Sequence, residues 1–303
     1  MATAYSQEYP LGTPSVVGNS VTVDLMLKEP TRINNYLSNI ALKGYFAERI
    51  FTNGGGVSGG ALLYSQLTSN DLFPTRAAQK VAPGQEFPEV TFDRPEPKTA
   101  QVEKLGGKFR VTDEARDRND LSSIQGEGVK LGNDIQRQLH VRAIAELDAS
   151  LTAIGSAGTM VGSSWSDAAA LTFNTTSNSV LPLADFANLR RLADEREFGT
   201  QFNLLIVSPQ ERANFEIASG GMANAQALLS ANAMTMLTSN VIPAGTAYAV
   251  QEGLVGQVRY EQPLRTTTYR DESTESSWVQ SSVRSVFAVT NPYNAIRLTG
   301  LAA

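Results

Sequence analysis

One stretch in the first fifth of the chain has the spacing of a catalytic motif. Residues 56–60 read Gly-Val-Ser-Gly-Gly, which matches the G-x-S-x-G element of serine hydrolases. That chemistry needs Ser58 on a strand-to-helix turn and a His that accepts its proton. The chain has a single His, His140, inside a long predicted helix, and an apolar strand is predicted after Ser58. A glycine hinge is therefore favoured, and a soluble hydrolase that uses Ser58 stays as an alternative.

Residues that hold metals and nucleotides are scarce. The chain has no Cys and one His, which excludes thiolate sites and His clusters. Asp117, Asn119 and Leu121 begin like a calcium loop, but the third ligand and the Gly at the sixth position are missing. The glycine-rich run 54–60 lacks the Lys-Ser/Thr pair of a phosphate-binding loop. We expect no cofactor, no metal and no catalytic residue.

Charge and composition narrow the function classes further. The 303 residues include 25 Lys and Arg against 30 Asp and Glu, a net charge of -5. This balance gives no basic excess for nucleic-acid binding by charge. We expect no secretory signal at the N-terminus and no membrane-spanning run of about 18 apolar residues.

A long amphipathic helix is the most pronounced predicted element. Apolar residues recur at helical spacing from Asn119 to Ile154. At 1.5 Å per residue the helix is roughly 50 Å long, more than a compact domain of this size needs. We infer that other parts of the chain, or a neighbouring subunit, lie along it.

Glycines interrupt the first half of this helix. Gly126, Gly128 and Gly132 lie within two turns. Each costs about 1 kcal/mol relative to Ala in a helix interior. We predict a bend or a switchable region there.

A proline-rich excursion precedes the helix. Two strands, 61–67 and 101–112, flank residues 68–99, which have no helical period. This pattern predicts an extended hairpin. A two-stranded ribbon is marginal alone in water, so we infer that the hairpin packs on another subunit.

The segments before the hairpin and after the long helix are predicted to have different secondary structure. Residues 1–20 are predicted as an extended arm, followed by a strand at 21–28 with alternating apolar residues and a short helix after Thr31. Residues 156–170 are predicted as a loop. From Leu181 to about 262 helices and strands alternate, which indicates a small α/β unit. A strand buried on both faces is expected at 202–208, and helices are expected at 209–218, with Pro209 at the first position, and at 223–237. Short β-rich runs follow up to residue 303.

This order of parts resembles the major capsid protein of tailed bacteriophages, a fold shared with encapsulin shells. The resemblance rests on the arm, the hairpin, the Thr112-Asp113-Glu114 element before the long helix, and the α/β unit. It implies an α+β fold with an N-arm, an E-loop hairpin, a P-domain with a long spine helix, and an α/β A-domain. The expected segments are the N-arm 1–30, the P-domain start 31–60, the E-loop 61–110, the P-domain with spine helix 111–180, the A-domain 181–262 and the P-domain return strands 263–303.

The resemblance implies a structural function. The chain would be a non-enzymatic virion protein that self-assembles into hexamers and pentamers of an icosahedral shell around double-stranded DNA, without sequence-specific DNA binding. Assembly would take place in the bacterial host cytoplasm, with separate scaffolding, portal and decoration proteins as candidate partners and no membrane. A scaffolding segment that many relatives carry at the N-terminus is not expected here.

The same resemblance suggests assembly contacts. The acidic residues Asp113, Glu114 and Asp117 favour the positive N-terminus of the long helix. They are also suited to receive Arg76 or Lys80 from the E-loop of a neighbour. An encapsulin-type compartment is the alternative shell. Those shells usually begin with a helix for cargo, whereas residues 1–30 are predicted as an arm with a strand, which favours the phage.

Overall fold

The structure is a computed structural model. It describes residues 46–68, 71, 74, 80–89, 95–170 and 180–302, with the backbone alone at 121–125. Nearer the N-terminus it describes Val23, Leu27, Pro30, Thr31, Ile33, Asn34, Asn35 and Leu37. Arg76 lies outside the described residues.

The first of two main units is built on a five-stranded sheet. The strand order is β5-β11-β8-β6-β7, with β5 parallel to β11, β6 parallel to β7, and the other neighbours antiparallel. The strands are β5 (Thr159–Val161), β6 (Leu204–Val207), β7 (Thr235–Thr238), β8 (Thr246–Val250) and β11 (Ala295–Thr299). The helices are α6 (Trp165–Ala170), α7 (Pro182–Glu195), α8 (Pro209–Ala218) and α9 (Met222–Ala231). Short 3-10 turns, η2 (Gly155–Gly158) and η5 (Pro292–Asn294), precede β5 and β11.

The central strands of this sheet are buried on both faces. In β6, Leu204 and Ile206 belong to the core cluster on the side of the long helix. Leu205 and Val207 belong to the cluster that contains residues of α6–α9. Because successive side chains of a strand point to opposite faces, an all-apolar LLIV run fits a sheet covered on both sides.

The second unit is a four-stranded sheet of order β1-β9-β10-β4, in which β1 is parallel to β9 and the other pairs are antiparallel. The strands are β1 (Phe51–Gly56), β4 (Glu103–Thr112), β9 (Gly256–Asp271) and β10 (Ser276–Val289). The helix α3 (Ala47–Ile50) leads into β1, and η4 (Glu272–Thr274) closes the β9–β10 hairpin. A separate pair, β2 (Ala61–Ser65) and β3 (Pro97–Gln101), is antiparallel.

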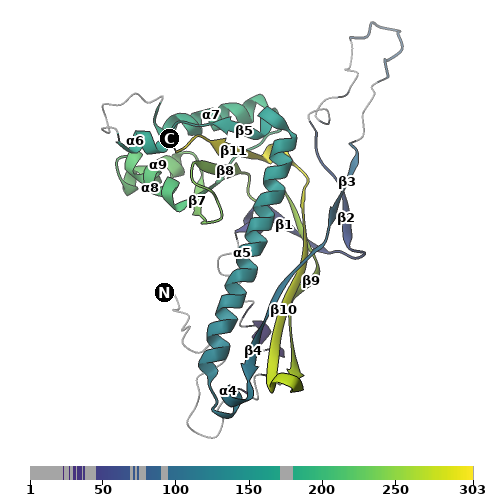
Figure 1. The fold of residues 1–303 in the computed structure, drawn as a ribbon. Coiled ribbons are helices and arrows are strands. Elements are labelled where there is room, and N and C mark those ends of the chain that lie inside the picture. Colours follow the sequence, from purple (N-terminus) through teal and green to yellow (C-terminus); the bar gives the residue numbers. More distant parts are fainter. Residues whose placement is uncertain are drawn as a thin grey trace, which may run out of the picture.

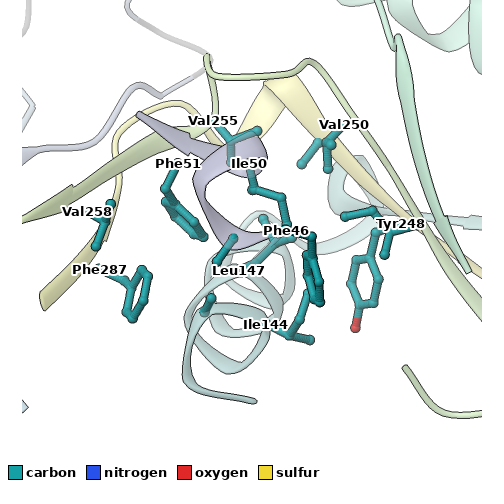
Figure 2. Close-up of a cluster of buried hydrophobic side chains, with 14 of the residues drawn as sticks. Phe46, Ile50, Phe51, Ile144, Leu147, Tyr248, Val250, Val255, Val258 and Phe287 are labelled. Atoms are coloured by element: carbon teal, nitrogen blue, oxygen red, sulfur yellow. The ribbon is translucent and has the colours of Figure 1, made fainter. Parts of the chain in front are cut away.

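The long helix α5 (Leu121–Ala153) lies beside the four-stranded sheet and reaches the five-stranded unit (Figure 1). The short helix α4 (Asp113–Asp117) comes directly before it. Residues of both sheets meet on α5: Figure 2 shows Phe51 and Phe287 on one side of Leu147, and Tyr248 on the other side. The helix therefore joins the two units through one hydrophobic core.

Most predicted elements are confirmed, including the long helix, the strands 61–65 and 103–112, the buried strand 204–207 and the helix 209–218. The helix α5 runs without interruption through Gly126, Gly128 and Gly132. A bend in this region stays a prediction.

Three local predictions are wrong. The predicted strand at 21–28 is helical at Val23 and Leu27, both buried against Phe109 and Val279. Their spacing of four residues fits a helical face as well as an alternating strand. The predicted loop 156–170 contains β5 and α6, where Trp165 is fully buried.

The predicted helix 223–237 ends at Ala231, because residues 235–238 pair with β6 as strand β7. Sheet pairing also places β11, from the segment 263–303, beside β8 rather than in the four-stranded sheet. The division of the chain into domains stays a prediction.

Candidate assembly surface

The β2–β3 hairpin extends from the body at the end opposite to α4 (Figure 1). At its base, Leu62 packs with Val286 and Ala288 of β10. Backbone hydrogen bonds hold the base, since Leu67 N donates to Thr290 O at 2.7 Å and Val102 N donates to Gly60 O at 2.9 Å. The hairpin is therefore held to the body along β2 and just past its end, where Gln66 also donates to the Val289 carbonyl.

Large apolar side chains on the hairpin are exposed. Leu63 is 68% exposed on β2, and Phe87 is 83% exposed in the described segment 80–89. Lys80, one of the two cations predicted to contact a neighbour, is also exposed. Within the described chain, no other apolar side chains bury Leu63 and Phe87, and such exposed apolar residues are typical of an interaction surface.

The acidic element before α5 already makes hydrogen bonds within its own subunit. Thr112 caps α4 by accepting a hydrogen bond from Ala115 N at 3.4 Å. Arg270 of β9 donates to both carboxylate oxygens of Asp113, at 2.9 and 2.7 Å. These bonds, together with the nearby charge of Arg116, lower the pKa of Asp113. Hydrogen bonds to its own backbone N–H and to the Thr112 hydroxyl lower the pKa of Glu114.

Asp117 is far more accessible than Asp113, whose side chain is 19% exposed. The side chain of Asp117 is 73% exposed and lies 3.5 Å from Arg116 Nε. The structure brings Asp113, Glu114 and Asp117 together on α4, whereas the hairpin with Lys80 extends at the other end of the molecule (Figure 1). A contact between Lys80 and this element therefore needs a second copy of the chain.

The sequence analysis did not find Arg270 or the charged face of β4. Lys104, Lys108 and Arg110 alternate along β4 and are exposed. Lys108 Nζ lies 4.2 Å from the Trp278 ring centroid and donates to the Tyr269 hydroxyl at 3.2 Å. The spacing of cations at every second or fourth residue in 104–110 could have predicted this charged face, because side chains two residues apart on a strand point to the same side.

The glycines of α5 have different environments. Gly128 and Gly132 are buried, whereas Gly126 is exposed and a Cβ there would meet nothing within 4 Å. On the facing strand, a Cβ at Gly107 would come within 2.6 Å of Leu131 Cδ1. Close approach of β4 to α5 at Gly107 therefore accounts for that glycine.

A polar contact ties α5 to the five-stranded sheet. Asp148 accepts hydrogen bonds from Arg297 at 2.6 Å and from the Tyr248 hydroxyl at 3.1 Å. Burial and the Asp148 charge raise the pKa of Tyr248, which keeps its phenol protonated. These contacts fix where the spine helix meets β8 and β11.

Ser58 does not have the setting of a nucleophile elbow. It is exposed and lies between strands β1 and β2, so no helix follows it. His140 is buried in α5 with its ring 4.2 Å from that of Phe46, and burial lowers its pKa to about 4. Among the described residues, no group of three or more His, Asp or Glu is placed to hold a metal ion.

Comparison with known proteins identifies the class. The sequence matches the family described as phage capsid protein over residues 95–298, and the chain belongs to this family. Comparison with curated protein sequences finds no significant match. No helix in the described part of the chain is long and apolar enough to cross a membrane.

Solved structures share the fold at low sequence identity. A virus-like particle from Pyrococcus furiosus is 17% identical with a TM-score of 0.60, over 88% of this chain and 97% of that one. A structure from Mycobacterium phage Cain is 12% identical with a TM-score of 0.58, over 86% of this chain and 91% of that one. The capsid structure of Cyanophage P-SCSP1u is 11% identical with a TM-score of 0.57, over 84% of this chain and 88% of that one. These likenesses show that the fold is that of phage capsid proteins, as the sequence predicted.

Proposed function

We propose that this chain is a major capsid protein whose copies assemble into hexamers and pentamers of an icosahedral virion shell around double-stranded DNA. Membership of the phage capsid family supports the class of protein. Two structures with a similar fold come from a capsid and from a virus-like particle, which supports assembly into a closed particle. The shell would assemble in the bacterial host cytoplasm.

The observation that carries the proposal is the projecting β2–β3 hairpin. It is held to the body along β2, and it exposes Leu63 on β2 and Phe87 in the described segment beyond it. A two-stranded ribbon of this kind gains stability by packing on another surface. In a shell, the adjacent subunit supplies that surface, so the hairpin of each copy lies across the next copy.

The charges of the molecule suit a container rather than a sequence-specific DNA-binding protein. The net charge is -5, and the acidic residue Asp117 is open at the end of the molecule opposite to the hairpin. Lys80 of one copy would approach Asp117 of the next. Separate scaffolding, portal and decoration proteins would complete the virion.

A structural, non-enzymatic role follows from the same proposal. The family is one of capsid proteins, and Ser58 lies in a strand–turn–strand setting. A Ser58→Ala variant is expected to assemble as the wild type does. Loss of a measurable hydrolytic activity in that variant would favour the hydrolase instead.

Electron microscopy of the purified, overexpressed chain tests the proposal. We expect shells, capsomers or tubes in negative stain, and species much heavier than 32.6 kDa by light scattering. A strict monomer at high protein concentration would contradict assembly.

A protein compartment that houses cargo enzymes is the second candidate. A virus-like particle from Pyrococcus furiosus has a similar fold, and a particle of that kind need not be a virion. In addition, Val23 and Leu27 are helical, so the strand that favoured the phage over the compartment is absent at those positions. The contents of particles made in the native host separate the two: nuclease-protected DNA supports the virion, and a co-purifying enzyme without DNA supports the compartment.

A further inference from the structure

The four-stranded sheet has one face that the rest of the described chain leaves open. Register pairs Lys104 with Arg284, Lys108 with Gln280 and Arg110 with Trp278. Residues directly opposite each other in a ladder point to the same side of the sheet. This face therefore carries a row of cations along β4 with an aromatic ring at one end.

A hollow separates the first two cations. It measures about 370 Å³ and is lined by Lys104, Gly106, Gly107, Lys108, Gln280, Ser281 and Ser282. At Gly106 the two strands approach so closely that a Cβ would come within 2.6 Å of the Ser281 carbonyl oxygen, so this position of the lining requires glycine. Arg284 is paired with Glu261 at 3.3 Å, but no described carboxylate forms a salt bridge with Lys104 or Lys108. The face thus presents a cation, a hollow and a second cation.

The tip of the hairpin carries the complementary pattern. Residues 85–89 read Gln-Glu-Phe-Pro-Glu, and Glu86, Phe87 and Glu89 are exposed. Phe87, at 83% exposure, is the most exposed large apolar side chain in the described chain. An acid, an aromatic ring and a second acid therefore follow one another on a projecting segment.

The two patterns also match in length. Four strand residues place the Cα atoms of Lys104 and Lys108 about 13 Å apart. Three residues allow Glu86 and Glu89 to lie up to about 10 Å apart, and flexible side chains cover the difference. In one chain the hairpin extends away from the sheet, so the tip reaches such a face on another copy (Figure 1).

We propose that the tip segment 85–89 of one copy docks on the β4–β10 face of a neighbour. Phe87 enters the hollow over Gly106, and Glu86 and Glu89 pair with Lys104 and Lys108. This inference rests on the proposed shell function and assigns the contact that the hairpin makes. The paired charges set the register between copies, and the buried ring supplies apolar contact area.

Charge exchange tests the contact. The variants Glu86→Lys/Glu89→Lys and Lys104→Glu/Lys108→Glu are each expected to lose particles, and the variant with all four changes is expected to regain them. Arg190→Glu/Arg191→Glu on α7 is the control with the same charge change as the lysine pair, and it should assemble. Thermal unfolding of each variant confirms that the subunit is folded. Normal particles from the single-side variants, or no recovery in the four-fold variant, would overturn the proposal.

Cross-linking gives a second, direct test, because the natural chain contains no Cys. Particles of Phe87→Cys/Gln280→Cys are oxidised and run on a non-reducing gel. Disulfides need Cα atoms within about 7 Å, so we expect a ladder of linked copies. Phe87→Cys/Ser230→Cys, with the second Cys on α9, should give none.

The outcomes separate this inference from the proposed function. Particles that form normally but do not cross-link would overturn the docking contact and leave the shell function standing. A chain that forms no particles under any condition would overturn both. Lys104→Glu/Lys108→Glu particles of normal shape that have lost DNA retention would overturn the contact and assign the face to a polyanion.

Discussion

The two sheets of this protein are covered very differently. The five-stranded sheet lies between α5 and the helices α6–α9, and its central strands β6 and β8 bury both faces. The four-stranded sheet buries one face against α5 and the helical residues near the N-terminus, while the other face carries exposed cations. The difference indicates that the first sheet stabilises the subunit and that the second, with its hairpin, meets neighbours.

The two tryptophans give the largest expected contrast between the sheets. Trp165 is fully buried, and its indole N–H donates to the buried carboxylate of Asp185 at 2.7 Å. We expect Trp165→Ala to lower the free energy of unfolding by about 3–5 kcal/mol, because it leaves a cavity. Denaturant unfolding of the subunit measures this loss. Trp278→Ala, on the half-buried side of the other sheet, is the control and should cost clearly less. Equal losses would contradict the comparison.

Acid should weaken the junction between the two sheets. His140 is buried beside Phe46, and its pKa is lowered to about 4 from the ordinary 6.5. The unfolded chain therefore binds a proton at His140 more readily than the folded chain does. The contribution of the neutral, buried His140 to the free energy of unfolding is complete above pH 6.5 and is lost as the pH falls toward 4. The loss amounts to roughly 3 kcal/mol.

Unfolding curves between pH 7 and 4 measure this dependence. The variant His140→Phe removes the titrating group and keeps an aromatic ring against Phe46. It should show a flatter dependence over the same range. A slope identical to that of the wild type would contradict burial of a neutral His140 in the folded state.

Two glycines on facing elements should respond in opposite directions. Gly106→Ala on β4 would force a Cβ within 2.6 Å of the Ser281 carbonyl oxygen, a backbone atom, and should cost about 1–3 kcal/mol, the range for overpacking. Gly126→Ala meets open space on α5 and should stabilise the subunit by about 1 kcal/mol. Thermal unfolding measures both changes. If Gly126→Ala particles form and mature normally, the predicted bend at this position is wrong.

The smallest expected effect concerns the exposed link between α4 and β9. Arg270→Gln removes the guanidinium that binds Asp113, so the pKa of Asp113 should rise toward its ordinary value. A carboxyl titration by NMR measures the shift. An unchanged Asp113 pKa would show that the pair does not persist in solution.

Much of the fold was predictable because its patterns are local. The apolar spacing along 119–154 indicates a helix with one covered face, and the apolar run at 204–207 indicates a strand covered on both faces. Both predictions are confirmed. Pro209 also correctly predicted the start of α8, where the structure adds a cap: Ser208 accepts a hydrogen bond from Glu211 N.

The errors arose where distant partners decide the structure. Val23 and Leu27 fit either a strand or a helix, and packing on Phe109 and Val279 selects the helix. Residues 235–238 have helix-compatible types but pair with β6. The same reason applies to the site: the distant Arg270 satisfies Asp113, which the order of residues along the chain does not show. Arg76 lies outside the described residues, and its contact stays a prediction.

Hydrogen–deuterium exchange on free subunits and on assembled particles tests the central claim most directly. We predict that assembly adds protection to residues 61–65, 80–89 and 97–112, which belong to the hairpin and to β4. The strands β6 and β8 should be protected equally in both states, because they are already covered within the subunit. New protection confined to β6 and β8, with none in the hairpin, would contradict the assignment of stability to one sheet and assembly to the other.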